Sequence, residues 1–310
     1  MSADNESDDD GDLETMVITL GSRMIKAAYA GEKTCRYLSQ QVHVLTTTDS
    51  TLIEQVHVLT STDSTLIEPD EGKSIPLLDT TEEKVNQKQA LVTALRKCWS
   101  EQYGINLQPT ETRLALVVPT RSSTLLNEIA DLVFSELKVL SLCVMTPGEA
   151  VGLIDDGENS VVVDIGYRET RVETFVGWQL VDRIIVVRGG CDVVKLSGGT
   201  DPREVIFSAD CHSRSIPDIV RSLLEKYDKI SRVIAVGSTS YKLDSQYFED
   251  KCGVSYTNSR SIKYHLPPER NKSAWLGASI AGGIPQCKHR FYTAGEWNEK
   301  GTIYTPLIKS

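Results

Sequence analysis

A run of β-branched residues followed by an acid and a glycine is the feature that most constrains the fold of this chain. Residues 160–163 (SVVV) are typical of a strand buried on both faces. Asp164 and Gly166 come directly after it, so a carboxylate lies at the end of the strand and a glycine turns the chain. Residues 170–176 alternate in polarity and predict an antiparallel return strand. The carboxyl end of a buried strand is where α/β proteins bind phosphates and metals, so Asp164 and Gly166 are the first candidate site residues.

A second unit of the same kind lies near the N-terminus. Residues 16–20 are apolar, Gly21 and Ser22 break the run, and residues 24–30 resume as a second strand that carries Lys26. In such a hairpin, backbone N–H groups and the serine hydroxyl can face an anion while the lysine neutralises its charge. Two interpretations stay open here: a phosphate-binding hairpin, or a plain hairpin without a ligand.

The rest of the chain alternates strand patterns with helix patterns, which predicts an α/β protein. Thr80-x-x-Glu83 is a capping box and predicts the start of the first helix. Residues 188–217 are glycine-rich, and their weak periodicity predicts irregular structure. The expected helices are residues 91–99, 125–137, 147–154, 219–227, 274–281 and 296–299, and the further expected strands are residues 113–118, 139–145, 180–187, 232–236 and 262–265.

The net charge of −10 argues against nucleic acid as a partner, because phosphate binding requires a basic face. Acidic residues crowd residues 1–14, which favours a solvated, disordered tail over an interaction tail. This N-terminus lacks the pattern of a signal peptide. No window approaches the ~18 consecutive apolar residues of a membrane span, so membrane insertion is not expected.

The cysteines indicate a reducing compartment. There are seven, scattered through the chain without a Cys-x-x-Cys pair. No second pair of ligands stands at a suitable spacing from Cys211-His212 or Cys287-x-His289, so we expect no metal site.

Residues 41–68 contain a tandem repeat. QVHVLTTTDSTLIE is followed directly by QVHVLTSTDSTLIE, and the two copies differ only at Thr47 and Ser61. Two copies are too few for a solenoid. A core would not easily absorb the added residues, so we expect the repeat on a surface excursion.

Two strings near the C-terminus carry a family resemblance. PPER at residues 267–270 and SAWLGASI at residues 273–280, with EWNE at residues 296–299 behind them, resemble the actin superfamily. With the order of hairpins, strands and helices, the resemblance runs from about residue 16 to residue 310. It implies an actin-like (ribonuclease H-like) two-domain α/β fold with a central nucleotide cleft. The implied domains are residues 15–158 completed by 262–310, and residues 159–261 with a reduced fourth subdomain at 188–217.

The resemblance also implies a nucleotide site. In actins two hairpins clasp the ATP phosphates and a Gly-Gly-Thr turn lies under the adenosine. By position, the corresponding residues of this chain are Gly21, Ser22 and Lys26 in the first loop, Asp164, Gly166 and Thr170 in the second, and Gly237 and Thr239 in the third.

Several groups that the family uses for hydrolysis are missing. Thr19 replaces an aspartate that holds hydrated Mg²⁺, Arg23 replaces a glycine, Tyr167-Arg168 replaces Asp-Gly, Arg171 replaces a histidine, and Pro147 replaces a water-positioning glutamine. Phosphoryl transfer depends on the metal and on a positioned water. We therefore expect no catalytic residue and no bound metal, and expect that ATP or ADP, if bound, is not efficiently hydrolysed.

The string Gly166-Tyr167-Arg168-Glu169 resembles the actin-related proteins of the dynactin pointed end. This implies a non-catalytic subunit of dynactin that caps the pointed end of its actin-like filament and supports dynein-based transport on microtubules, in the cytoplasm and cytoskeleton. The implied partners are the filament subunits and the pointed-end dynactin subunits, with Trp297 as a candidate contact. Two alternatives stay open: a nuclear actin-related protein of a chromatin-remodelling complex, and an active Mg-ATPase of the actin, hexokinase and heat-shock-protein class.

Overall fold

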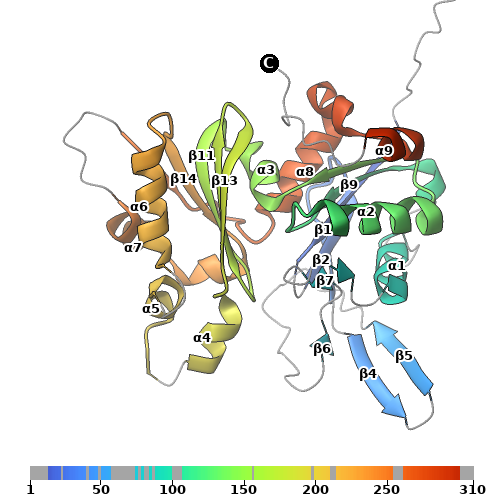
Figure 1. Cartoon of the computed structure of the whole chain (residues 1–310), viewed down its shortest axis with the longest axis horizontal. Coiled ribbons are helices and arrows are strands. Elements are labelled where there is room, and N and C mark those ends of the chain that lie inside the picture. The colour runs from blue at the N-terminus through green and yellow to red at the C-terminus, as the bar shows by residue number, and fades with distance from the viewer. Residues whose placement is uncertain are drawn as a thin grey trace, which may run out of the picture.

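The computed structural model describes residues 13–300 except 22–23, 40–41, 48–49, 57–73, 76–77, 80–83, 86–87, 100–106, 156, 197–198, 210–213 and 254–260. The described elements form two five-stranded mixed sheets, a three-stranded sheet and a two-stranded sheet, with helices around them (Figure 1). The chain is therefore an α/β protein, as the alternation of patterns predicts. The acidic tail at residues 1–12 lies outside the described residues.

The first five-stranded sheet combines an antiparallel meander with two parallel strands. Its order is β10-β9-β1-β2-β3, in which β1–β2–β3 are antiparallel neighbours and β9 and β10 run parallel to β1. The bounds are β1 Thr15–Leu20, β2 Met24–Tyr29, β3 Arg36–Ser39, β9 Arg113–Val117 and β10 Ser141–Met145.

The second five-stranded sheet repeats this topology. Its order is β13-β12-β11-β14-β15, with an antiparallel meander β11–β12–β13 and two strands parallel to β11. The bounds are β11 Asn159–Ile165, β12 Thr170–Val176, β13 Gln179–Val186, β14 Arg232–Val236 and β15 Lys263–His265. The hairpin predicted around Asp164 is confirmed, and Asp164 itself lies within β11.

Helices cover the two sheets and fill the space between them. The first sheet packs a core against α1 Lys88–Lys97, α2 Ser123–Leu132 and Trp297 of α9 Ala294–Lys300, and the second packs a core against α5 Pro202–Phe207, α6 Ile216–Lys226 and α7 Ser245–Cys252. The described residues also contain the helical segments η2 Pro109–Glu111, η3 Val133–Leu137 (π-helical), η4 Ser238–Lys242 and η5 Pro285–Arg290.

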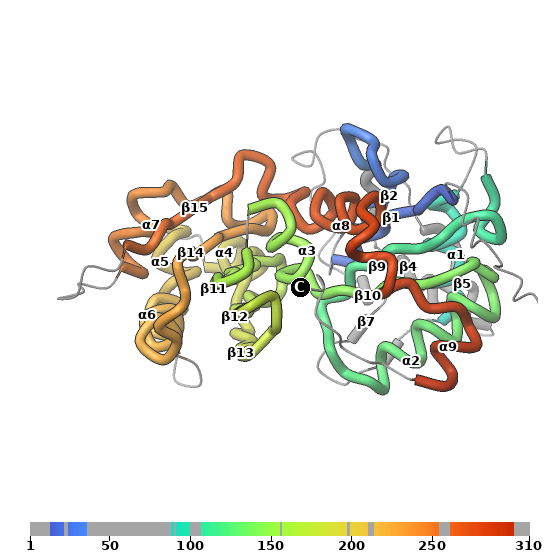
Figure 2. Tube along the Cα trace, turned by 90° about the horizontal axis from the view of Figure 1, so that it is seen from above, coloured from blue at the N-terminus to red at the C-terminus, as the bar shows by residue number. Residues whose placement is uncertain are grey.

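Two helices, α3 Pro147–Gly152 and α8 Ser273–Gly283, lie between the sheets, and the view turned by 90° shows the same (Figures 1 and 2). They pack tightly, because a Cβ on Gly277 would lie 1.7 Å from the carbonyl oxygen of Ala150. Trp275 of α8 is fully buried against the first sheet. Val151 of α3 packs on the inner face of the second sheet.

The expectation of irregular structure over residues 188–217 is wrong. This region contains α4 Gly190–Leu196 and α5, and α6 begins within it at Ile216. Asp201 caps α5 by accepting a hydrogen bond from the backbone N–H of Arg203, and Pro202 takes the first helical position. Helices of six and seven residues are too short to give a clear sequence period, which explains the error.

The repeat at residues 41–68 is described only in part. The first copy forms most of a hairpin, β4 Val42–Thr47 and β5 Ser50–Val56, in a three-stranded sheet with β6 Ser74–Ile75, separate from the five-stranded sheets. Residues 57–68 of the second copy lie outside the described residues. The predicted helix start at Thr80 is wrong, because β7 Leu78–Asp79 pairs with β8 Lys84–Val85 and α1 begins only at Lys88.

Candidate functional site

The two hairpins predicted to hold phosphate close with the same geometry. The N–H of Gly21 donates to the carbonyl oxygen of Met24 at 3.0 Å, and the N–H of Gly166 donates to that of Glu169 at 3.0 Å. An added Cβ would meet the same carbonyl oxygen at 2.9 Å in each case, so both turns require the close approach that glycine allows. Ser22, the candidate hydroxyl of the first turn, lies outside the described residues.

An acid precedes only one of the two turns. Thr19 is the second-last residue of β1 and pairs with Lys26, whereas Asp164 is the second-last residue of β11 and pairs with Arg171. Thr19 is buried, and its Oγ1 has no hydrogen-bond partner among the described residues. The position at which the family resemblance places a metal-holding aspartate is therefore filled by a neutral side chain in the first hairpin.

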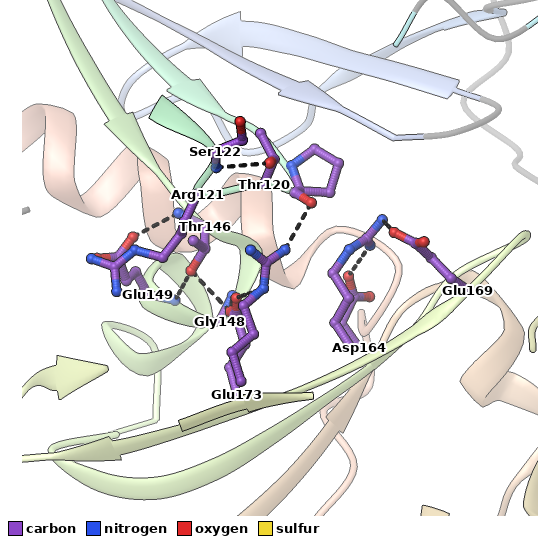
Figure 3. Close-up of polar contacts among 12 residues, drawn as sticks. Thr120, Arg121, Ser122, Thr146, Gly148, Glu149, Asp164, Glu169 and Glu173 are labelled. Carbon is purple, nitrogen blue, oxygen red and sulfur yellow. Dashed lines mark hydrogen bonds and ion pairs between the residues drawn. The ribbon is translucent and has the colours of Figure 1, made fainter. Parts of the chain in front are cut away.

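The charges around Asp164 are compensated by the chain itself. Nη1 of Arg171 donates to Oδ2 of Asp164 at 3.3 Å, and the same guanidinium pairs with Glu169, so that both acids point toward one cation (Figure 3). Burial lowers the pKa of Lys26, and electrostatic interactions with Cys35 and Asp164 partly offset this. The charge of Asp164 in the second sheet therefore acts on Lys26 in the first sheet.

The third predicted loop lies directly against the second hairpin. Gly237 has φ of +93°, and a Cβ there would lie 2.4 Å from the carbonyl oxygen of Ile165 and 2.7 Å from Oδ1 of Asp164. Oγ1 of Thr239 donates to the carbonyl oxygen of Gly166 at 2.9 Å. We call the cluster of Gly21, Lys26, Asp164, Gly166, Arg171, Gly237 and Thr239 the hairpin site.

The start of α4 covers the backbone of the second turn. The N–H of Gly190 donates to the carbonyl oxygen of Gly166 at 3.1 Å, and that of Cys191 donates to Tyr167 at 2.8 Å. A Cβ on Gly190 would lie 2.7 Å from Oγ1 of Thr239 and 3.2 Å from the ring of Tyr167, so this approach also requires glycine. The backbone N–H groups of Gly190 and Cys191 at the helix start therefore already donate to carbonyl groups of the protein itself.

The predicted hydrogen-bond donors of the site also donate to backbone carbonyl groups of the protein. Oγ1 of the fully buried Thr170 donates to the carbonyl oxygen of Arg188 at 2.8 Å, and the N–H of Gly237 donates to that of Arg270 at 2.9 Å. With the bonds of Gly21, Gly166 and Thr239 given above, the predicted glycine N–H groups and threonine hydroxyls all have protein acceptors. In this arrangement these donors do not fit a nucleotide phosphate chain, and Lys26 is the predicted cation that is left to face one.

Pro147 begins α3 at the position where the family resemblance places a glutamine. Thr146 caps this helix, and the carboxylate of Glu149 accepts a hydrogen bond from the N–H of Thr146 at 2.7 Å. Pro147 is buried and carries no amide to orient a water molecule. Among the described residues no group of three or more His, Cys, Asp or Glu side chains lies close enough to hold a metal ion.

Sequence reasoning missed a buried ion pair next to the hairpin site. Glu173 of β12 is 2% exposed and lies 3.2 Å from Nε of Arg183 of β13. Its pKa is raised by burial, which the positive charge of Arg183 partly counters. A glutamate on a strand whose neighbours are otherwise buried was the available signal, because an unpaired carboxylate is rarely buried.

The structure places Trp297, the candidate partner contact, in the core rather than on the surface. The side chain is 6% exposed and packs into the core of the first sheet. Its ring lies 6.5 Å from that of Phe134 and 6.4 Å from that of Tyr292. The last helix is short and mostly polar, so its sequence did not reveal that this one residue faces inward.

No protein-family model matches the chain, and a search of curated proteins gives no significant match. Within the described residues no helix has the length and apolar character needed to cross a membrane. A function is therefore inferred from the residues and their arrangement.

Proposed function

We propose that this chain is a non-catalytic actin-related protein with the two-domain actin fold. The single observation that carries the proposal is the repeated hairpin. The two five-stranded sheets have equivalent strand orders, each with a meander of three strands followed on the other side by two parallel strands. The first hairpin of each sheet closes through a glycine N–H that donates to the carbonyl oxygen three residues later. The charge of Asp164 raises the pKa of Lys26 in the other hairpin against the larger effect of burial. This interaction supports a paired arrangement of the hairpins like the phosphate clasp of actins.

The loss of chemistry supports a role without hydrolysis. Thr19 supplies no carboxylate, Pro147 supplies no amide, and Arg171 is held by Asp164 and Glu169. Transfer of a phosphoryl group to water, as in ATP hydrolysis, needs a metal and an oriented water. We propose that any ATP or ADP is held weakly, through Lys26, and is not hydrolysed at a useful rate.

The cellular role that we propose is structural: a dynactin subunit that caps the pointed end of the actin-like filament and supports dynein-based transport in the cytoplasm. The string from Gly166 to Glu169 supports this choice among actin-related proteins. The acidic net charge of −10 favours protein partners, namely filament subunits and pointed-end dynactin subunits, over nucleic acid.

End-labelling of filaments tests the role directly. The purified, tagged chain is mixed with actin-like filaments of dynactin that lack their pointed-end subunits, and the tag is located by electron microscopy. We expect the tag at one end of each filament. A tag along the sides, or no association, contradicts the proposal.

Two further measurements separate the alternatives. Affinity purification of the tagged chain from cells is expected to recover dynactin subunits, whereas recovery of a chromatin-remodelling ATPase would favour the nuclear alternative. ATP turnover is measured with and without Mg²⁺ for the wild type and for Asp164→Asn. Mg-dependent turnover that the substitution abolishes would favour the active ATPase.

A further inference from the structure

Glu173 is buried at the boundary between the two sheets, outside the hairpin site. Its Oε2 accepts hydrogen bonds from Oγ1 of Thr146 and from the N–H of Gly148, each at 2.9 Å (Figure 3). A Cβ on Gly148 would lie 2.2 Å from this oxygen, so the approach requires glycine. A residue of the second sheet is thereby fixed to the start of α3, which follows the last strand of the first sheet.

Arg183 makes a second connection between the sheets. Nε of Arg183 lies 3.2 Å from Oε1 of Glu173, and its Nη2 donates to the carbonyl oxygen of Pro119 at 2.9 Å. Pro119 follows β9 of the first sheet, whereas Arg183 belongs to β13 at the edge of the second. One guanidinium therefore contacts a carboxylate of the second sheet and the backbone of the first.

The start of α3, to which Glu173 is bonded, is itself held against the first sheet. Glu149 of α3 lies 3.6 Å from Nη1 of Arg290, and both side chains are almost fully buried. Nη2 of Arg290 donates to the carbonyl oxygen of Val144 in β10 at 2.7 Å. The start of α3 is thus fixed to the first sheet. A displacement of Glu173 relative to α3 would therefore also strain the contacts of α3 with the first sheet.

We propose that Glu173 and Arg183 form a clamp that holds the two five-stranded sheets in one relative orientation without a bound nucleotide. Two observations support this. Glu173 is buried and Arg183 is only 17% exposed, and removal of the arginine would leave the carboxyl group without its ion-pair partner. The donors of the hairpin site that would otherwise connect the sheets through phosphates are committed to the protein's own carbonyl groups. The clamp does not depend on which assembly the chain joins.

The distance between two spin labels, one on each side of the clamp, tests the proposal. Labels are placed at the exposed positions Asn127 of α2 and Glu225 of α6, in the full chain with Cys191→Ser and Cys211→Ser. We expect one narrow distance distribution that Mg-ATP and Mg-ADP leave unchanged. Arg183→Ala is expected to shift and broaden the distribution, with unchanged far-ultraviolet circular dichroism.

Lys226→Ala is the matched control. Lys226 pairs with Asp182, the neighbour of Arg183, at 2.7 Å, but both residues belong to the second half of the chain. We expect the wild-type distribution for this variant. If Arg183→Ala does not fold, Arg183→Lys, which keeps the charge but cannot span both partners, takes its place.

Hydrogen exchange gives an independent measurement. Glu173→Ala removes the acceptor of the Gly148 N–H, so we expect that amide to exchange about tenfold faster. An unchanged label distance in Arg183→Ala and Arg183→Lys overturns the clamp. A wild-type distribution that is broad alone and narrows with Mg-ATP also overturns it. Failure of the filament-capping experiment would leave these measurements unaffected.

Discussion

Thr19 and Asp164 occupy the same position in two hairpins of one geometry. Each is the second-last residue of the first strand in its hairpin. Each lies opposite a basic residue on the neighbouring strand, Lys26 for Thr19 and Arg171 for Asp164. The acid is present in one hairpin and absent from the other. Arg171 pairs with Asp164 and with Glu169, and the charge of Asp164 also acts on Lys26 of the other hairpin.

The first prediction concerns the cost of burying Lys26. Its folded-state pKa lies below the ordinary value of 10.5 because burial disfavours the charged form. Protonation of Lys26 is therefore less favourable in the folded than in the unfolded state, and the resulting cost to stability disappears as the pH rises from the folded pKa to above 10.5. We expect Lys26→Met to raise the free energy of unfolding by about 1 kcal/mol at neutral pH.

The pH dependence provides the check. Urea unfolding of wild type and variant is measured between neutral pH and the ordinary pKa of lysine, and the difference should shrink as the pH rises. Asp164→Asn should destabilise the wild type more than it destabilises Lys26→Met, because Lys26 loses a compensating charge only in the first background. Equal effects in the two backgrounds would contradict the predicted coupling.

The second prediction concerns the contact of α3 with α8. Gly277→Ala places a methyl group 1.7 Å from the carbonyl oxygen of Ala150, so the helices must separate. We expect a loss of about 3 kcal/mol in urea unfolding. Gly283→Ala, in the same helix with no atom within 4 Å of the new Cβ, is the control and should change stability by no more than about 1 kcal/mol. Similar effects of the two substitutions would mean that the helices do not approach this closely.

The third prediction distinguishes the core from a partner surface at Trp297. Because the side chain is buried among the rings of Phe134 and Tyr292, Trp297→Ala should cost about 3–5 kcal/mol of stability. Val187→Ala, at a side chain that is 76% exposed, should stay within about 0.5 kcal/mol. Chemical unfolding measures both variants. An unchanged stability of Trp297→Ala, with weakened filament binding, would restore the partner contact.

The fourth prediction concerns the thiols. Burial raises the pKa of Cys143 and Cys252 to about 12 and that of Cys98 still further, so these thiolates are scarce at physiological pH. Among the cysteines that the structure describes, Cys191 alone is partly exposed. Burial also raises the pKa of Cys191, but this thiol is accessible, so among the described cysteines we expect iodoacetamide at about pH 8 to modify Cys191 first. The buried thiols should react only after unfolding in urea, as read by peptide mass spectrometry. Rapid labelling of Cys143 in the native protein would show that the core opens.

The sequence by itself determined the local units of this protein. The β-branched run and the Asp-x-Gly turn predicted the hairpin that the structure forms at Asn159–Val176, because strand period and turn chemistry are local properties. The same reasoning located β14 at Arg232–Val236 and the small-residue helix α8. It failed for α4 and α5, which are too short to show a period, and for the helix start at Thr80, where strand pairing prevailed over a local cap.

Only the tertiary structure decided what the site residues do. Thr239 reaches the carbonyl oxygen of Gly166, Arg183 reaches that of Pro119, and Trp297 turns into the core, each through contacts between segments distant in sequence. Whether a donor is available to a ligand depends on which carbonyl group packing brings beside it, and whether a buried charge is tolerated depends on which opposite charge lies near. Neither quantity is encoded in the spacing of residues along the chain, so the sequence indicated a phosphate site and the fold committed its donors to the protein itself.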